Sequence, residues 1–203
     1  MQDDRYRTDT GEDKAWSELA AAGPVEVAAN SGASYDSATG LFTIKILGSP
    51  YTVDPAARTL TDAQSPGNPP EYFLNLSTPI YLVHARPVPP SGRLVREFTG
   101  GEFFFRGAHT LPLDAIAEKY GSDGNLFKRA CSEALGGVPA EIGDAACSFS
   151  VYPRVSMTFV LWLSDEEFPA RAGLLFDSNA GMHMPLDVVW AVALLACQRL
   201  LKY

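Results

Sequence analysis

The stretch VSMTFVLWLSDEEFPARAGLLFD, residues 155–177, contains the clearest structural pattern in the sequence. Large apolar residues occupy every odd position from 155 to 163, which predicts a strand with one buried face. The next residues, SDEEFPA at 164–170, have the acids and the proline of a turn. RAGLLFD at 171–177 is apolar again and should return beside the first strand. The stretch therefore predicts an antiparallel hairpin.

Two further strand pairs are expected upstream of this hairpin. GLFTIKILG at 40–48 alternates and is followed by PYTVD at 50–54, which predicts a second hairpin. GRLVREFTGGEFFFRG at 92–107 predicts a third, in which Gly100 or Gly101 supplies the positive φ of the turn.

Helices are expected between and after these pairs. Apolar spacing, glycine stops and proline starts predict five of them, at residues 14–23, 71–86, 111–121, 124–137 and from 185 onward.

Hairpin pairs and separate helices favour an α+β fold over repeated βαβ units. We expect an antiparallel or mixed sheet built from hairpins, with helices packed on one face. A chain of 203 residues with 46% hydrophobic residues is long enough for one core. Residues 15–203 are therefore predicted to form a single domain. Residues 1–14 are polar and acidic and are predicted to be a disordered tail.

Composition excludes several classes of protein. The net charge is −8 and lysines and arginines do not cluster, so nucleic acid is not an expected partner. The apolar segment at 185–203 is too short for a membrane span and contains Asp187, so we expect a buried helix and no membrane partner. The amino terminus lacks a secretory signal and the three cysteines form no CxxC pair, which together favour a cytoplasmic protein with reduced thiols.

Acidic residues in the turn suggest a metal or acid/base site. Asp165, Glu166 and Glu167 stand in a row, and Asp177 closes the next predicted strand. Carboxylates brought close together would bind a cation or shift one another's pKa. His183, between two methionines, would suit a soft metal or serve as an axial ligand to a cofactor. The alternative is that these acids only keep a turn in water, and the sequence leaves both open.

Other residues suggest a binding pocket for a small molecule. The sequence contains no GxSxG, HExxH or phosphate-loop motif, so enzymatic activity stays open and no cofactor is assigned. Aromatic residues are frequent, and a pocket between the sheet and the last helix is expected. Its candidate ligand-binding residues are His84, Phe104, Trp162 and Trp190.

Several stretches resemble a bacterial and archaeal family known as domain of unknown function 3786. They are YLVHA, REFTGGEFFFRG, GDAACSFSVYPRVSMTFVLWLSDEEFPARAGLLFD and MPLDVVWAVALL. The resemblance implies an association with anaerobes and, through neighbouring iron–sulfur cluster domains in some members, with corrinoid, tetrapyrrole or one-carbon metabolism. This chain has no cysteine cluster of its own.

Three functions follow as hypotheses. The first is a cytoplasmic binding or accessory protein for a small ligand or cofactor. The second is a metal-dependent enzyme that uses the carboxylates of Asp165, Glu166, Glu167 and Asp177, with His183 as an optional further ligand. The third is a structural subunit that binds a protein partner through an apolar patch.

Overall fold

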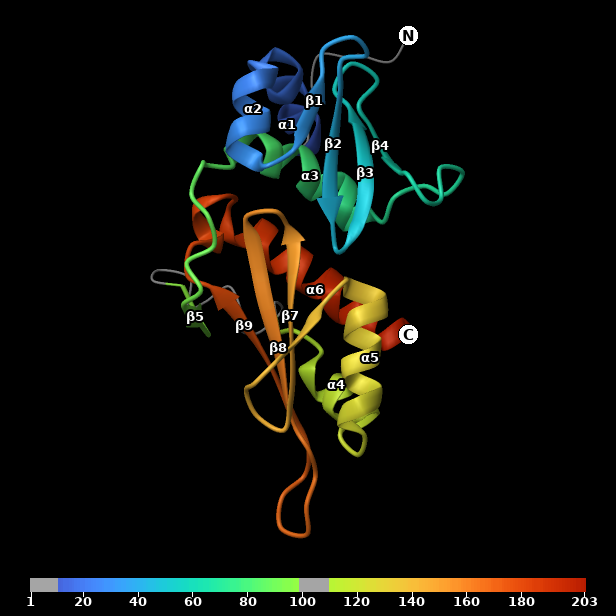
Figure 1. The fold of residues 1–203 in the computed structure, drawn as a ribbon, viewed down its shortest axis with the longest axis vertical. Helices are drawn as coiled ribbons and strands as arrows, with labels where there is room; N and C mark the ends of the chain where they lie inside the picture. The colour runs from blue at the N-terminus through green and yellow to red at the C-terminus, as the bar shows by residue number, and fades with distance from the viewer. Residues whose placement is uncertain (1–10, 99–109) are drawn as a thin grey trace, which may run out of the picture.

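The computed structural model describes residues 11–98 and 110–203, and it confirms an α+β fold in a single domain. Within these residues the strands form two antiparallel sheets instead of one (Figure 1). The predicted glycine turn at Gly100 and Gly101 lies outside the described residues, as does Phe104. Sequence patterns identify hairpins but not which hairpins share a sheet, which is why two sheets were not foreseen.

The first sheet is a meander of four strands in the order β1-β2-β3-β4. Its strands are β1 (Ser34–Asp36), β2 (Leu41–Ile46), β3 (Ser49–Asp54) and β4 (Thr59–Asp62). The predicted pairing of β2 with β3 is confirmed, with Phe42 opposite Val53. Leu47 and Gly48 both have positive φ, which is the conformation of a two-residue hairpin turn.

Helices α1 (Gly11–Ala21), α2 (Pro24–Ser31) and α3 (Tyr72–His84) accompany this sheet. Residues 11–14, expected in the tail, instead form the first turn of α1. The reason is that Asn75 donates to Glu12 at 2.6 Å and Arg58 lies 3.6 Å from Asp13, which anchors the helix start. Helix α3 continues through Pro79.

The second sheet has five strands in the order β5-β9-β8-β7-β6. They are β5 (Leu94–Val95), β6 (Val138–Ala140), β7 (Ala145–Tyr152), β8 (Val155–Trp162) and β9 (Arg171–Asp177). The hairpin predicted from residues 155–177 is confirmed, because β8 pairs antiparallel with β9 from Met157↔Phe176 to Trp162↔Arg171.

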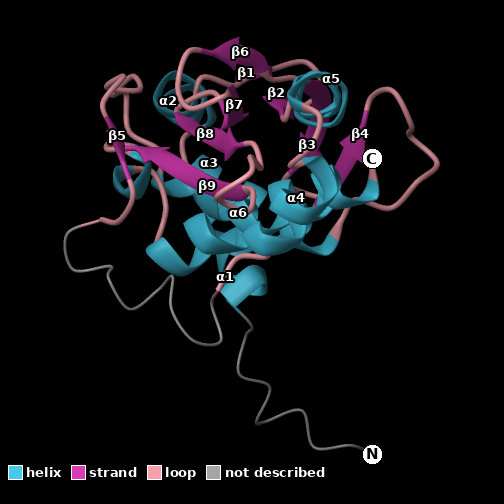
Figure 2. Ribbon diagram, turned by 90° about the horizontal axis from the view of Figure 1, so that it is seen from below, coloured by secondary structure: helices cyan, strands magenta, loops and turns pink. Residues whose placement is uncertain are grey.

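Helix α6 (Leu186–Lys202) covers one face of this sheet, flanked by α4 (Leu113–Tyr120) and α5 (Gly124–Leu135) (Figures 1 and 2). A short 3-10 helix, η3 (Ala180–Met182), precedes α6. Met157, Phe159 and Leu161 of β8 are fully buried. Among the described residues, no helix has both the length and the apolarity needed to cross a membrane.

Four contacts join the first sheet and its helices to the second sheet and its helices. The backbones of Gly48 and Gly136 touch, and Leu47 N donates to Val151 O at 3.1 Å. Tyr81 of α3 stacks on Tyr152 of β7. Arg154, in the β7–β8 turn, donates to the carbonyls of Asn30 and Ala29 at the end of α2. One continuous core results.

Candidate functional site

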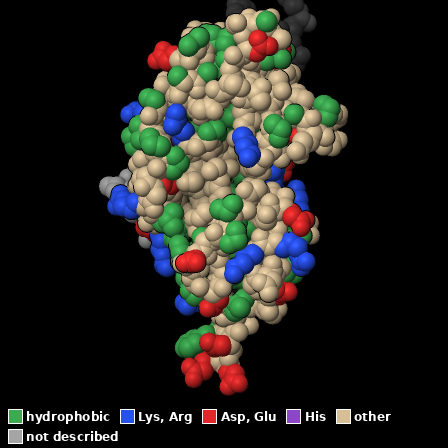
Figure 3. Space-filling model, in the orientation of Figure 1, with side chains coloured by type: hydrophobic (Ala, Val, Ile, Leu, Met, Phe, Trp, Pro, Cys, Tyr) green, Lys and Arg blue, Asp and Glu red, His purple; other side chains and the backbone are tan. Residues whose placement is uncertain are grey.

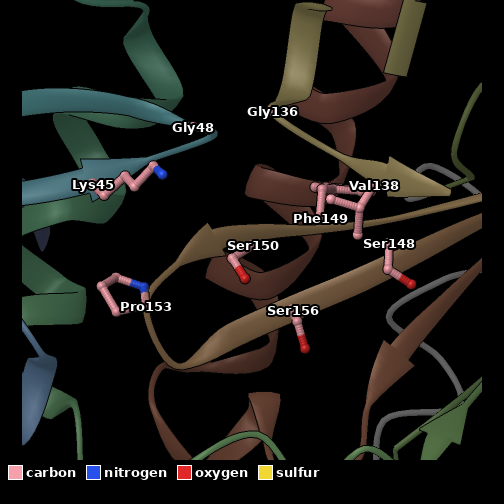
Figure 4. Close-up of a pocket in the computed structure, with 9 residues that line it drawn as sticks. All are labelled: Lys45, Gly48, Gly136, Val138, Ser148, Phe149, Ser150, Pro153 and Ser156. Carbon is pink, nitrogen blue, oxygen red and sulfur yellow. The ribbon is translucent and has the colours of Figure 1, made fainter. Parts of the chain in front are cut away.

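A groove lies where the tip of the first sheet meets the β7–β8 hairpin (Figure 4). Its volume is about 390 Å³, which is within the range of sites for small molecules. We call it the serine groove. It is lined by Lys45, Gly48, Gly136, Val138, Ser148, Phe149, Ser150, Pro153 and Ser156.

Serine hydroxyls form the floor of the serine groove because of strand register. Ser150 of β7 is directly opposite Ser156 of β8, so their side chains share a face. Ser148 is opposite Thr158, and their hydroxyl oxygens lie 2.7 Å apart. This is the face of the sheet that α6 does not cover, so the hydroxyls of Ser150 and Ser156 are available to a ligand.

The walls of the groove are fixed by close backbone packing. Gly48 and Gly136 both have positive φ, and a Cβ built on Gly136 would lie 2.6 Å from the Gly48 Cα. At the other end, Pro153 packs against Gly32. Because these contacts join turns from different elements, the groove exists before any ligand binds.

Lys45 is the only charged residue among the described residues that line the groove. It is exposed on β2, and its side chain extends toward the β7–β8 hairpin (Figure 4). The described lining contains no carboxylate, although the chain carries 24 acidic residues against 16 basic ones. The groove is therefore a locally positive site on an acidic protein.

A model of the family described as domain of unknown function DUF3786 matches residues 23–199. The chain belongs to this family. No curated protein and no solved structure matches the chain. The match includes the serine groove and both sheets, so the groove is part of the DUF3786 domain itself.

The aromatic residues predicted to bind a ligand do not converge in the DUF3786 structure. His84 is exposed at the end of α3, and Trp190 of α6 packs edge-on against Phe73. Trp162 is half-buried on the face of the sheet opposite α6. The space between sheet and last helix, where the pocket was expected, is occupied by core side chains.

Asp165 and Glu167 lie in the turn between β8 and β9. The β8–β9 hairpin projects from the body of the domain (Figures 1 and 3). Asp165 accepts hydrogen bonds from the backbone N–H groups of Glu167 and Phe168, which lowers the pKa of its carboxyl group. Both acids are exposed. Asp165 therefore closes the turn, the role that the alternative interpretation gave to the acids.

Asp177 lies at the opposite end of β9 and is buried. It accepts hydrogen bonds from the N–H groups of Ser91, Gly92 and Asn179 and from the Ser91 hydroxyl, at 2.7–3.1 Å. Burial alone would raise the pKa of this carboxyl, but the donors outweigh burial and the pKa is lowered. Through these hydrogen bonds, Asp177 at the end of β9 holds the segment before β5 in place.

His183 is fully buried between η3 and α6. Its Nδ1 accepts from the Arg86 N–H at 3.3 Å, so the neutral ring carries its proton on Nε2, which has no partner among the described residues. The predicted metal ligands are thus divided between the two ends of β9. Within residues 11–98 and 110–203, no three His, Cys, Asp or Glu side chains are placed to hold a metal ion.

His183 should make stability depend on pH. Burial lowers its pKa, with a further contribution from the positive charges of Arg154 and Arg86, although Asp177 acts in the opposite direction. A histidine whose pKa is lowered by folding stabilises the protein fully above the unfolded value of 6.5, and this stabilisation is lost as the pH falls. Urea denaturation should show a loss of up to about 2 kcal/mol between pH 6.5 and 5.0.

The matched variants for this test are His183→Gln and His84→Gln. The first should remove most of this pH dependence. The second changes an exposed side chain and should retain the wild-type profile. An equal pH dependence in wild type and His183→Gln would contradict the assignment.

Proposed function

We propose that this DUF3786 protein binds a small anionic molecule in the serine groove. The observation that carries the proposal is the combination of Lys45 with the Ser150 and Ser156 hydroxyls in a cavity whose described lining contains no acid. A lysine ammonium and serine hydroxyls all donate hydrogen bonds, so together they suit a phosphate or a carboxylate. Val138 and Pro153 provide apolar contact for the rest of the ligand.

The same lining favours binding over covalent catalysis. A serine becomes a nucleophile when a neighbouring base removes its proton. The described lining of the groove contains no His, Asp or Glu, and within the described residues Lys45 makes no hydrogen bond to Ser150 or Ser156. The hydroxyls are therefore suited to orient a ligand by hydrogen bonding.

Thermal unfolding with small anions tests the proposal. Inorganic phosphate and succinate are the first probes, because they separate phosphate from carboxylate recognition. We expect one of them to stabilise the fold, by about 2.7 kcal/mol at a concentration 100 times its Kd. Lys45→Met keeps the apolar stem but removes the charge, and it should weaken binding about tenfold by calorimetry.

Lys14→Met is the matched control, since Lys14 is an exposed lysine on α1 whose partner is Glu18. It should bind like the wild type. Absence of stabilisation by both anions, or equal losses in the two lysine variants, would contradict a specific site at Lys45.

A protein-interaction role is the second candidate, and one observation favours it. Phe168 is 63% exposed at the tip of the projecting β8–β9 hairpin, beside the acids of the turn. An exposed aromatic side chain on a projecting turn is a suitable anchor for a partner. The metal-dependent enzyme and the link to anaerobic corrinoid, tetrapyrrole or one-carbon metabolism stay predictions, as does the cytoplasmic location.

A further inference from the structure

A second cavity lies along β9, near the β5–β9 edge of the second sheet and away from its β6 edge. Its volume is about 440 Å³. Trp162 and Val160 of β8, Gly173 of β9, Leu113 at the start of α4 and two arginines, Arg96 and Arg171, contribute to its lining. We call it the arginine pocket. Its described lining shares no residue with the serine groove.

Trp162 gives the arginine pocket a flat aromatic wall. A Cβ built on Gly173 would lie 3.4 Å from the indole ring, so the ring rests on bare backbone. On its strand, Trp162 is directly opposite Arg171, whose guanidinium lies 5.6 Å from the ring centroid. Contacts with backbone and guanidinium together hold the indole in one orientation, as a planar ligand requires.

Two positive charges lie at the pocket without compensating acids. Arg96 and Arg171 are both exposed, and neither has a carboxylate partner within the described parts of the chain. No Asp or Glu belongs to the described lining. In a protein of net charge −8, two guanidiniums at one apolar cavity, neither paired with a carboxylate of the described residues, favour an anion.

We propose that the arginine pocket is a second binding site, specific for a planar aromatic molecule that carries a carboxylate. The ring system packs against Trp162, Val160 and Leu113, and the carboxylate accepts hydrogen bonds from both Arg171 and Arg96. Guanidinium groups match the planar geometry of a carboxylate, and an indole presents a stacking surface for the ring.

Calorimetry with 2-naphthoate and its neutral analogue 2-naphthamide tests the site. We expect the wild type to bind the carboxylate about tenfold more tightly than the amide. Arg171→Gln and Arg96→Gln should each remove most of this preference while leaving amide binding nearly unchanged. Trp162→Leu should weaken both ligands, because it removes the stacking surface.

Two controls make the result specific. Arg93→Gln changes an exposed arginine outside the pocket and should bind 2-naphthoate like the wild type. Lys45→Met should do the same, which separates this site from the serine groove. No binding by the wild type, equal affinity for acid and amide, or an equal loss in Arg93→Gln would each overturn the proposal. If Trp162→Leu does not fold, the two surface arginine variants still decide it.

Discussion

Replacing Gly136 by alanine should destabilise the protein by about 3 kcal/mol or more, because two separate costs add at this position. Gly136 ends α5 with φ 61°, a left-handed conformation that costs an L-residue about 1 kcal/mol. The new Cβ would also lie 2.6 Å from Gly48 Cα and 3.1 Å from Gly48 N. Both of those atoms are backbone, so the clash cannot be relieved by rotating a side chain.

Gly40→Ala is the matched control for this substitution. Gly40 has φ 75°, yet nothing lies within 4 Å of a Cβ built there. Its substitution should cost only about 1 kcal/mol, the conformational part of the effect. Chemical denaturation of both variants measures the difference, which reports the contact between the two sheets.

The double variant Gly48→Ala/Gly136→Ala tests whether the two glycine turns are in contact. Gly48→Ala alone should be costly, since its Cβ would lie 2.8 Å from Gly136 Cα. Because either substitution already separates the two turns, the pair should cost less than the sum of the single variants. Equal effects of Gly136→Ala and Gly40→Ala would show that the turns are not in contact in solution.

Asp177→Asn should be the second large effect, with a loss of about 3 kcal/mol. The carboxylate is buried and receives only donors, from Ser91, Gly92 and Asn179. An amide is nearly the same shape but turns its own N–H groups toward some of these donors. Buried N–H groups are then left without acceptors, which costs more than the loss of a solvent-exposed hydrogen bond.

The pH dependence of this loss identifies its origin. Folding lowers the pKa of Asp177, so its contribution is present above the unfolded value of 3.8 and disappears as the pH falls below it. Wild type and Asp177→Asn should therefore differ most at neutral pH and converge in acid. Asp165→Asn, an exposed acid with two backbone donors, is the control and should change stability much less.

Metal titration of the same variants separates a structural role from a ligand role. If Asp177 only accepts hydrogen bonds within the fold, divalent metal ions should change the stability of neither the wild type nor the variant. Stabilisation by a metal ion that is seen in the wild type and lost in Asp177→Asn would instead support the metal-site hypothesis.

Local periodicity predicted the helices and strands better than it predicted which of their faces are buried. The β8–β9 and β2–β3 hairpins follow from alternation and turn residues, and the structure confirms both. The last helix was also foreseen, but its buried face was not. Trp190 and Leu194 are only half-buried, whereas Val189, Ala193 and Cys197 are buried. The helix is apolar on several sides, so spacing alone cannot select the side that packs.

The serine groove was not predicted because its residues are far apart in the chain. Lys45 and the segment containing Ser148, Ser150 and Ser156 are separated by more than half of the sequence. A local signal did exist, since Ser148 and Ser150 alternate with buried residues and so mark one polar face of a strand. The hydrogen bond from Leu47 to Val151 and the contact between Gly48 and Gly136 bring Lys45 to that face.

The hydrogen bonds that Arg154 donates to α2 affect the order in which the chain can fold during synthesis. Its guanidinium closes the end of α2 through the carbonyls of Asn30 and Ala29, which lie 124 and 125 positions earlier in the sequence. Tyr152, which stacks on Tyr81, is translated at the same late stage. The amino-terminal helices and strands therefore emerge from the ribosome well before the residues that complete their packing. The apolar surface that these residues cover stays exposed until the chain has grown past residue 154, and such exposed surface favours aggregation.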